Sequence, residues 1–196
     1  MGDYSNNYTE AKKGYIIFST EEGKRITKFK PFLDTFGYEI SVSYAKPAEE
    51  DAFDIYTGAP VTETFNHSKY SIGFFVVAAN VDEAIENHKK FQILARLVAP
   101  TRESVTTLKK IGVKFSNLIS KDGSRGLNRP SASQAAARSV VGVIKDLQYT
   151  PEMESGFFFH KGLMFAKSFK LDISLETTGQ QDNTNPQIFR SGYTYT

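Results

Sequence analysis

The chain has 196 residues and a formal net charge of +2, with 24 Lys and Arg residues against 22 Asp and Glu residues. This length is sufficient for one sizeable hydrophobic core, and the balanced charge argues against nucleic-acid binding by bulk charge. Because the sequence contains no cysteine, disulfides, thiolate metal sites and thiol nucleophiles are excluded. The 16 Phe and 10 Tyr residues, without any Trp, favour β structure.

The sequence carries no recognisable targeting or membrane-spanning pattern. Residues 1–13 are polar and lack the apolar core of a signal peptide, and we expect them to form a flexible N-terminal arm. No apolar run approaches the roughly 18 residues of a membrane span. We therefore expect a soluble protein that does not act at a membrane.

The first half of the chain predicts three strands and a long hairpin. Residues 15–18 indicate a short strand, whereas the aromatic stretch 29–36 is interrupted by Pro31 and is expected to be an irregular connection. Apolar and polar residues alternate from Tyr38 to Tyr44, the pattern of a half-buried strand. Residues from about 45 to 70 are polar around a Gly-Ala-Pro turn and indicate the hairpin. The stretch 70–78 is apolar enough for a central strand.

One helix is predicted after these strands. Asn80 is placed to cap its N-terminus, Glu83 has the spacing of a capping box, and Pro100 stops the helix. A helix of about 18 residues is about 27 Å long and can cross one face of a small sheet. Its apolar stripe comprises Ala84, Ile85, His88, Phe91, Leu94, Ala95 and Val98, widened by Ile93 and Leu97.

The second half of the chain predicts a further strand, a mobile loop and a pair of strands. The strand covers Val113–Asn117, and residues 121–137 are rich in Gly, Ser and Ala, which indicates the mobile loop. From Arg138 to Glu176 two strand patterns are joined by a short acidic and aromatic connection, and the second pattern alternates strictly from Phe169 onward. Residues 178–196 are polar and are expected to form an extended C-terminal tail.

Together these elements predict a single α+β domain over residues 14–177. About six or seven strands with mostly hairpin-length connections would form an antiparallel β-sandwich or barrel, flanked by one helix. The hairpin at about 45–70 and the loop at 121–137 would belong to this domain.

The sequence offers no convergent set of reactive groups. No serine lies in a Gly-x-Ser-x-Gly elbow, and the stretch Gly123–Gly126 lacks a Walker lysine and a following helix signal. None of the histidines has the i, i+4 partner of a helical metal site; they are His67, His88 and His160. His88 is better interpreted as a helix residue at the boundary of the core.

The remaining charged residues also have simpler interpretations than catalysis. The carboxylates Glu152 and Glu154 lie in a turn, and nothing indicates the pocket that would separate their pKa values for acid–base work. Four basic residues could contact a polyanion, although a solvated loop is the simpler interpretation: Lys121, Arg125, Arg129 and Arg138. We therefore expect no catalytic, cofactor-binding or metal-binding residue. Long polar hairpins, Tyr-rich segments and extended termini instead favour association between copies.

Several segments between Tyr70 and Glu176 match one family pattern in order and spacing. The stretch FFVVAANVDEAIENHKKFQILARLVAPT forms a strand-then-helix unit, and VKFSNLIS provides the strand after it. A further strand motif has Gly142, Ile144, Leu147, Tyr149, Pro151, Glu152, Glu154, Gly156 and Phe157. The last strand motif has Lys167, Phe169, Leu171, Ile173 and Leu175, with Ala166 where the family often has Pro. In these features the chain resembles the tail-tube-fold proteins found in baseplates of contractile-tailed bacteriophages.

The resemblance implies a structural virion protein, assembled in the host cytoplasm, that forms a ring, expected to be hexameric. The inner sheets of the subunits would join into one β-barrel around a channel through which tape-measure protein and then DNA pass. Such rings join the baseplate hub to the tail tube and template tube assembly, with no enzymatic turnover and no cofactor. In that setting residues 54–70 would reach toward an adjacent ring, and the loop at 121–137 would order on stacking.

Two alternatives remain open at this stage. Within the same class, the chain could be the repeating tail tube subunit or a tube terminator, although its N-terminal arm and C-terminal tail favour a protein at a junction. In another class, it could be a small-ligand-binding β-barrel in which Phe157, Phe158 and Phe159 line a pocket.

Overall fold

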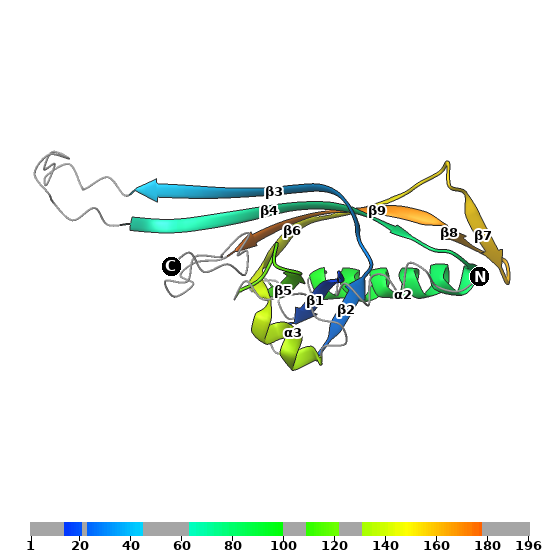
Figure 1. Cartoon of the computed structure of the whole chain (residues 1–196), viewed down its shortest axis with the longest axis horizontal. Helices are drawn as coiled ribbons and strands as arrows, with labels where there is room; N and C mark the ends of the chain where they lie inside the picture. The colour runs from blue at the N-terminus through cyan, green and yellow to red at the C-terminus, as the bar shows by residue number, and fades with distance from the viewer. Residues whose placement is uncertain (1–13, 21–22, 45–62, 100–108, 122–130, 178–196) are drawn as a thin grey trace, which may run out of the picture.

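The computed structural model describes residues 14–20, 23–44, 63–99, 109–121 and 131–177. These residues form an α+β domain with one main antiparallel sheet and two helices, which confirms the predicted class (Figure 1). The predicted features that lie outside the described residues are the arm at 1–13, the tip of the hairpin at 45–62, residues 122–130 of the loop, and the tail at 178–196. The elements are β1 Ile16–Thr20, β2 Ile26–Phe29, β3 Phe32–Tyr44, β4 Glu63–Val77, α2 Val81–Val98, β5 Ile111–Phe115, α3 Ala132–Arg138, β6 Val140–Pro151, β7 Phe157–His160, β8 Leu163–Ala166 and β9 Ser168–Thr177.

The main sheet has seven strands in the order β2-β1-β5-β6-β9-β4-β3, and every pairing is antiparallel. In a flat sheet β2 and β4 would lie roughly 24 Å apart, since neighbouring strands are about 4.8 Å apart. The ring centroids of Phe29 on β2 and Phe74 on β4 are nevertheless only 6.1 Å apart. The sheet therefore curls strongly around its core, as a sandwich or an open barrel does.

The interior of this curl contains the main hydrophobic core. Strand β9 supplies one complete face of it, because Phe169, Leu171, Ile173 and Leu175 are buried and their alternating neighbours are not. The strict alternation predicted for this strand is thus confirmed. Strands β1 and β5 contribute buried residues from the opposite side, and Leu94 and Leu97 of α2 lie within the same cluster.

Helix α2 begins and ends as the sequence predicts. The Asn80 side chain accepts a hydrogen bond of 2.9 Å from the backbone N–H of Glu83, and the helix runs for 18 residues. Leu94 and Leu97 of the expected stripe are buried, whereas Ile93 is 39% exposed. Asn87, which the stripe did not include, is 5% exposed. Neither described helix is long and apolar enough to cross a membrane.

The expectation of a single helix is wrong, because residues 132–138, largely within the predicted mobile loop, form α3. Ser131 and Gln134 make a reciprocal capping box, and alanines, the best helix formers, fill much of the helix. Ala135 is fully buried and packs with Tyr15 and Ile17 in a small second core on the other face of β1. Composition indicated flexibility here, but the cap and this contact favour a helix.

Three further expectations from the sequence are corrected. The stretch 29–36, expected to be irregular, contains the end of β2 and the start of β3, and Pro31 lies in the two-residue link between these strands. The short connection expected between β6 and β9 contains a separate two-stranded ribbon, β7–β8. The strand predicted over 113–117 is β5, which starts earlier at Ile111 and ends at Phe115.

Candidate functional site

Four long strands, β3, β4, β9 and β6, form a sheet with one polar face. The opposite face of these strands packs onto α2 and the core, whereas the polar face carries mainly hydroxyl, carboxylate, amino and glycine positions, with the apolar Phe32, Phe75 and Val77 at one end. Strands β3 and β4 form a hairpin and pair from Phe32 to Tyr44, and residues 45–62 of the predicted long hairpin lie outside the described residues. Two rows cross the polar face from β3 to β6: Gly37–Ser71–Ser174–Asp146 and Thr35–Gly73–Asp172–Gln148.

Gly73 allows polar side chains to gather at the centre of this face. A Cβ atom at this position would lie 2.3 Å from Thr35 Oγ1 and 2.6 Å from Asp172 Oδ1. The surrounding surface forms a shallow depression of about 210 Å³ that Asp146 and Gln148 also line. Ligand pockets usually enclose about 300–1,000 Å³, so this depression does not favour a small-molecule site.

Lysine and carboxylate groups form ion pairs across the polar face. Lys170 Nζ lies 2.9 Å from Asp34 Oδ2 on β3 and 3.2 Å from Asp172 Oδ1 on β9. The hydrogen bonds to Asp34 and then Asp172 raise the pKa of Lys170 above its ordinary value. Lys145 Nζ pairs with Glu176 Oε2 at 3.1 Å. Carboxylates outnumber amino groups on this face, since Glu39 and Asp146 add to these pairs while only Lys69 adds an amino group.

The same four strands end in two free edges. Within the described part of the chain, β3 pairs only with β4, and β6 pairs only with β9 from Val143 to Pro151. All pairings between these strands are antiparallel, so β3 and β6 run in opposite directions. Unpaired N–H and C=O groups along such edges are a template for pairing with another chain. The site is therefore an open four-stranded sheet with one polar face and two complementary edges.

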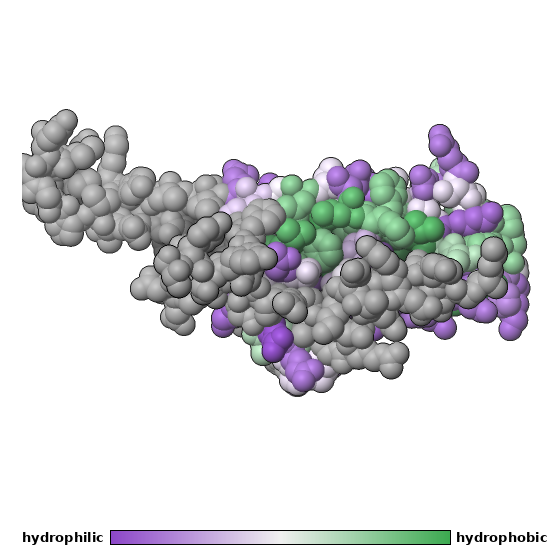
Figure 2. All heavy atoms as spheres, viewed as in Figure 1, coloured by the Kyte–Doolittle hydropathy of each residue, from purple (hydrophilic) through white to green (hydrophobic). Residues whose placement is uncertain are grey.

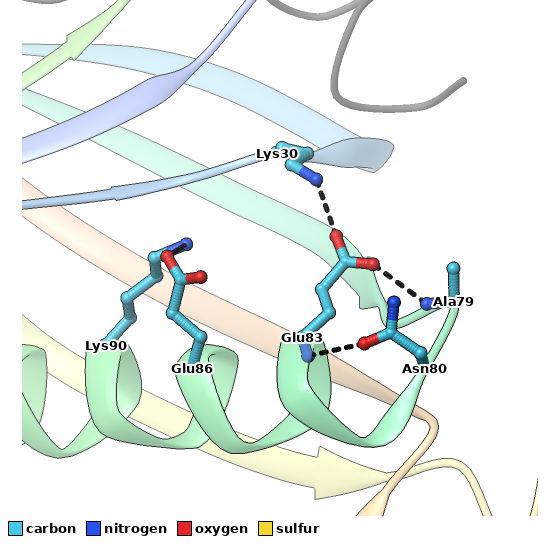
Figure 3. Close-up of polar contacts among 6 residues, drawn as sticks. All are labelled: Lys30, Ala79, Asn80, Glu83, Glu86 and Lys90. Atoms are coloured by element: carbon cyan, nitrogen blue, oxygen red, sulfur yellow. Dashed lines mark hydrogen bonds and ion pairs between the residues drawn. The ribbon is translucent and has the colours of Figure 1, made fainter. Parts of the chain in front are cut away.

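The start of β3 is anchored to α2 by a partly buried ion pair. Lys30, in the link between β2 and β3, places its Nζ 2.5 Å from Glu83 Oε1, and both side chains are less than 15% exposed. The other carboxylate oxygen of Glu83 accepts a hydrogen bond of 2.9 Å from the backbone N–H of Ala79 (Figure 3). Glu83 thus fixes both the first turn of the helix and the corner where β3 begins.

The histidines considered from the sequence do not converge. His88 packs on α2 among aromatic rings; one ring nitrogen contacts the Ala84 carbonyl oxygen at 2.9 Å and the other contacts the Tyr149 hydroxyl at 3.1 Å. His160 ends β7, and His67 lies on β4, where only the backbone is described. Within the described residues, no group of three or more His, Asp or Glu side chains is placed to hold a metal ion.

The other sequence candidates do not assemble into a reactive site either. Glu152 accepts a hydrogen bond of 2.7 Å from Ser155, which lowers the pKa of its carboxyl, the direction opposite to that of a general acid. Glu154 lies in the turn that follows β6. Lys121 and Arg138 are joined through a backbone hydrogen bond of 3.1 Å, and Arg125, Arg129 and the stretch 123–126 lie outside the described residues.

The three phenylalanines considered as a pocket lining form strand β7. Side chains alternate between the two faces of a strand, so Phe158 points away from the face shared by Phe157 and Phe159. Phe159 is 73% exposed. This arrangement does not support a common pocket for a small ligand.

Sequence patterns located part of the polar face but not its edges. The alternation in β9 already placed Lys170 and Asp172 on the solvent side. Asp34 was missed because its stretch was expected to be irregular, and the free edges were missed because strand order is not encoded in local periodicity. No protein-family model matches this chain, and no curated protein matches it.

Proposed function

We propose that the chain is a structural subunit that forms a closed ring in the tail or baseplate of a contractile-tailed bacteriophage. The observation that carries the proposal is the four-stranded sheet with one polar face and two free edges of opposite direction. The resemblance of residues 70–176 to tail-tube-fold proteins supports the same reading. The ring would connect the baseplate hub to the tail tube and template tube assembly.

The two edges permit a head-to-tail ring. Because β3 and β6 are antiparallel, β3 of one copy can pair with Val143–Pro151 of the next and continue the antiparallel pattern. The two surfaces are different, so the contact is heterologous and generates a closed ring when the rotation between copies closes. Closure would leave no exposed edge on these strands.

The proposed ring of six copies would leave a wide channel. Six sheets of four strands give about 24 strands, and at about 4.8 Å per strand the circumference is about 115 Å, or about 37 Å across, before strand tilt widens it. Barrels of 16–18 strands already leave an aqueous channel. A channel of this width suits the passage of tape-measure protein and DNA.

The polar face would line this channel, because the other face is covered by α2 and the core. Its carboxylates outnumber its amino groups, so its field repels rather than retains a polyanion. DNA could then move through without the phosphate contacts that produce strong non-specific binding. This behaviour is what a conduit requires.

Cysteine cross-linking tests the ring directly, since the natural chain contains no cysteine. Thr35→Cys on β3 is combined in turn with Asp146→Cys, Gln148→Cys or Thr150→Cys on β6, which covers three registers on the same face. We expect at least one pair to give, under oxidation, a ladder of covalent oligomers on a denaturing gel. The largest oligomer should contain as many copies as the ring, and negative-stain images should show rings.

The controls use the same face of the sheet. Each single cysteine should give no ladder, because β3 would meet β6 and not another β3. The pair Ser71→Cys and Ser174→Cys, which lie opposite each other on β4 and β9, should cross-link only within one chain. Monomers at all three registers, together with images that contain no rings, would contradict the proposal.

A further inference from the structure

The ribbon β7–β8 exposes an unusually apolar outer face. Phe159 and Met164 lie directly opposite each other in the ribbon and are 73% and 56% exposed, whereas Leu163, which pairs with His160, lies on the other face of the ribbon. Figure 2 shows hydrophobic residues over the middle of the long strands and again at the end formed by β7 and β8. Exposed clusters of large apolar side chains commonly mark contact surfaces for another protein. We call Phe159 and Met164 the ribbon patch.

The inner face of the ribbon is occupied by the domain itself. The Phe165 ring lies 5.5 Å from the His88 ring of α2, and Lys167 Nζ lies 5.2 Å from the centroid of Phe158. At the base of the ribbon, the backbone N–H of Lys167 donates to the Gly156 carbonyl at 3.1 Å. The ribbon is thus held at its base and inner face, and its outer face is presented to solvent.

A second apolar patch lies at the start of β3. Phe32 is 52% exposed and Leu33 is 43% exposed. Their side chains point to opposite faces at the free edge of β3, and we call these two residues the β3 corner. The ion pair between Lys30 and Glu83 anchors this corner to α2, so its position does not depend on a partner.

The ribbon patch and the β3 corner lie at the same end of the sheet but on opposite edges. Phe32 pairs with Phe75 near the end of β4, and Pro151 at the end of β6 pairs with Phe169 near the start of β9. The ribbon begins where β6 ends. When β3 of one copy pairs with β6 of the next, the β3 corner of the first copy is therefore brought to the ribbon end of the second.

We propose that the ribbon patch binds the β3 corner of the neighbouring copy. This inference rests on the proposed ring and names the contact that would stabilise it. Pairing of two strand edges supplies hydrogen bonds but little apolar burial, whereas stable interfaces bury about 800 Å² per partner around a core rich in aromatic residues and Met. The two patches supply that missing apolar core.

The test introduces opposite charges into the two patches in the double-cysteine background that forms a ladder. Met164→Lys alone and Leu33→Glu alone should each reduce ladder formation at least about tenfold, because each buries an unpaired charge at the contact. Both positions are exposed in the free chain, so thermal unfolding of the separate subunit should be unchanged. Ile93→Lys, an exposed apolar position on α2 outside both patches, is the matched control and should leave the ladder intact.

Mixing the two variants then tests the pairing itself. In a ring that alternates Met164→Lys copies with Leu33→Glu copies, every contact is either the natural pair or a lysine against a glutamate, so an equimolar mixture should recover the ladder. The double variant Met164→Lys, Leu33→Glu should recover it as well.

The remaining outcomes separate the two proposals. If none of the three double-cysteine chains forms a ladder and the images contain no rings, the ring itself is refuted. A parent that forms one while Met164→Lys and Leu33→Glu leave it unchanged refutes the ribbon contact alone. Loss of the ladder in the single variants without recovery on mixing shows that the patch binds some other surface, which also overturns the contact proposed here.

Discussion

At the scale of single residues, Gly142 marks the point where β6 changes partners. It pairs with Ile111 of β5, and the next residue pairs with β9. A Cβ atom at Gly142 would lie 2.5 Å from the carbonyl oxygen of Glu176, a backbone atom that cannot rotate away. The position therefore requires close approach of two backbones.

We expect Gly142→Ala to lower the free energy of unfolding by about 1–3 kcal/mol, the usual cost of forced overpacking. Urea denaturation measures it. Gly37→Ala is the control: its Cβ would meet only Ser71 Cβ at 3.6 Å, an ordinary contact, so its effect should be small. Equal stabilities for the two variants would show that the backbones of β6 and β9 can move apart at Gly142 without cost.

A second prediction concerns the buried phenol of Tyr70. Burial, followed by the neighbouring Tyr38, raises the pKa of Tyr70 far above its ordinary value of 10.0. The folded chain thus keeps this phenol protonated, while the unfolded chain ionises it above about pH 10. The associated stability is complete below pH 10 and is lost as the pH rises above that value.

Tyr70→Phe removes this ionisation and should weaken the alkaline loss of stability. Between pH 8 and pH 11 the variant should lose less free energy of unfolding than the natural chain, by up to about 1.4 kcal/mol. Urea denaturation of both proteins at the two pH values provides the comparison. Identical losses would mean that Tyr70 is not protected in the folded state.

At the scale of elements, Glu83 joins a helix to a strand corner. Its carboxylate contacts both Lys30 and the backbone N–H of Ala79, while Glu86 on the same helix pairs with Lys90 at 2.7 Å (Figure 3). The Glu86 side chain is 65% exposed, and its hydrogen bond from Lys90 lowers the pKa of the carboxyl. These two glutamates, three residues apart, should therefore contribute differently to the stability of the fold.

We expect Glu83→Gln to destabilise the chain by about 1–3 kcal/mol, because Lys30 is left partly buried without its counter-charge. Glu86→Gln should cost less than about 0.5 kcal/mol, as for an exposed i, i+4 pair. Thermal or urea unfolding of the two variants gives the difference. A cost for Glu86→Gln as large as that for Glu83→Gln would contradict the anchoring role of the corner.

At the scale of the whole molecule, curvature and edges must be considered together. The sheet curls around its own core but does not close on itself: among the described strands, no pairing joins β2 to β3, although a two-residue link connects them. The four long strands are therefore open along β3 and along most of β6. In the proposed ring, the largest cross-linked oligomer on the gel would give the number of copies and, from it, the width of the channel.

Local chemistry in the sequence determined much of the secondary structure. The caps and length of α2, the alternation of β9 and the hairpin of β3 and β4 follow from side-chain periodicity, helix capping and proline, which act over a few residues. The polar side of β9 could be predicted from the sequence for the same reason.

Only the tertiary structure decided which strands become neighbours. The order of the sheet, the free edges, the approach of Asp34 to Lys170 and the burial of Asn87 all depend on residues far apart in the chain. Helix α3 and the β7–β8 ribbon were missed because a cap, a buried alanine and packing against α2 outweigh their composition. Periodicity states which side of a strand is apolar; non-local packing selects the partner against which that side is buried.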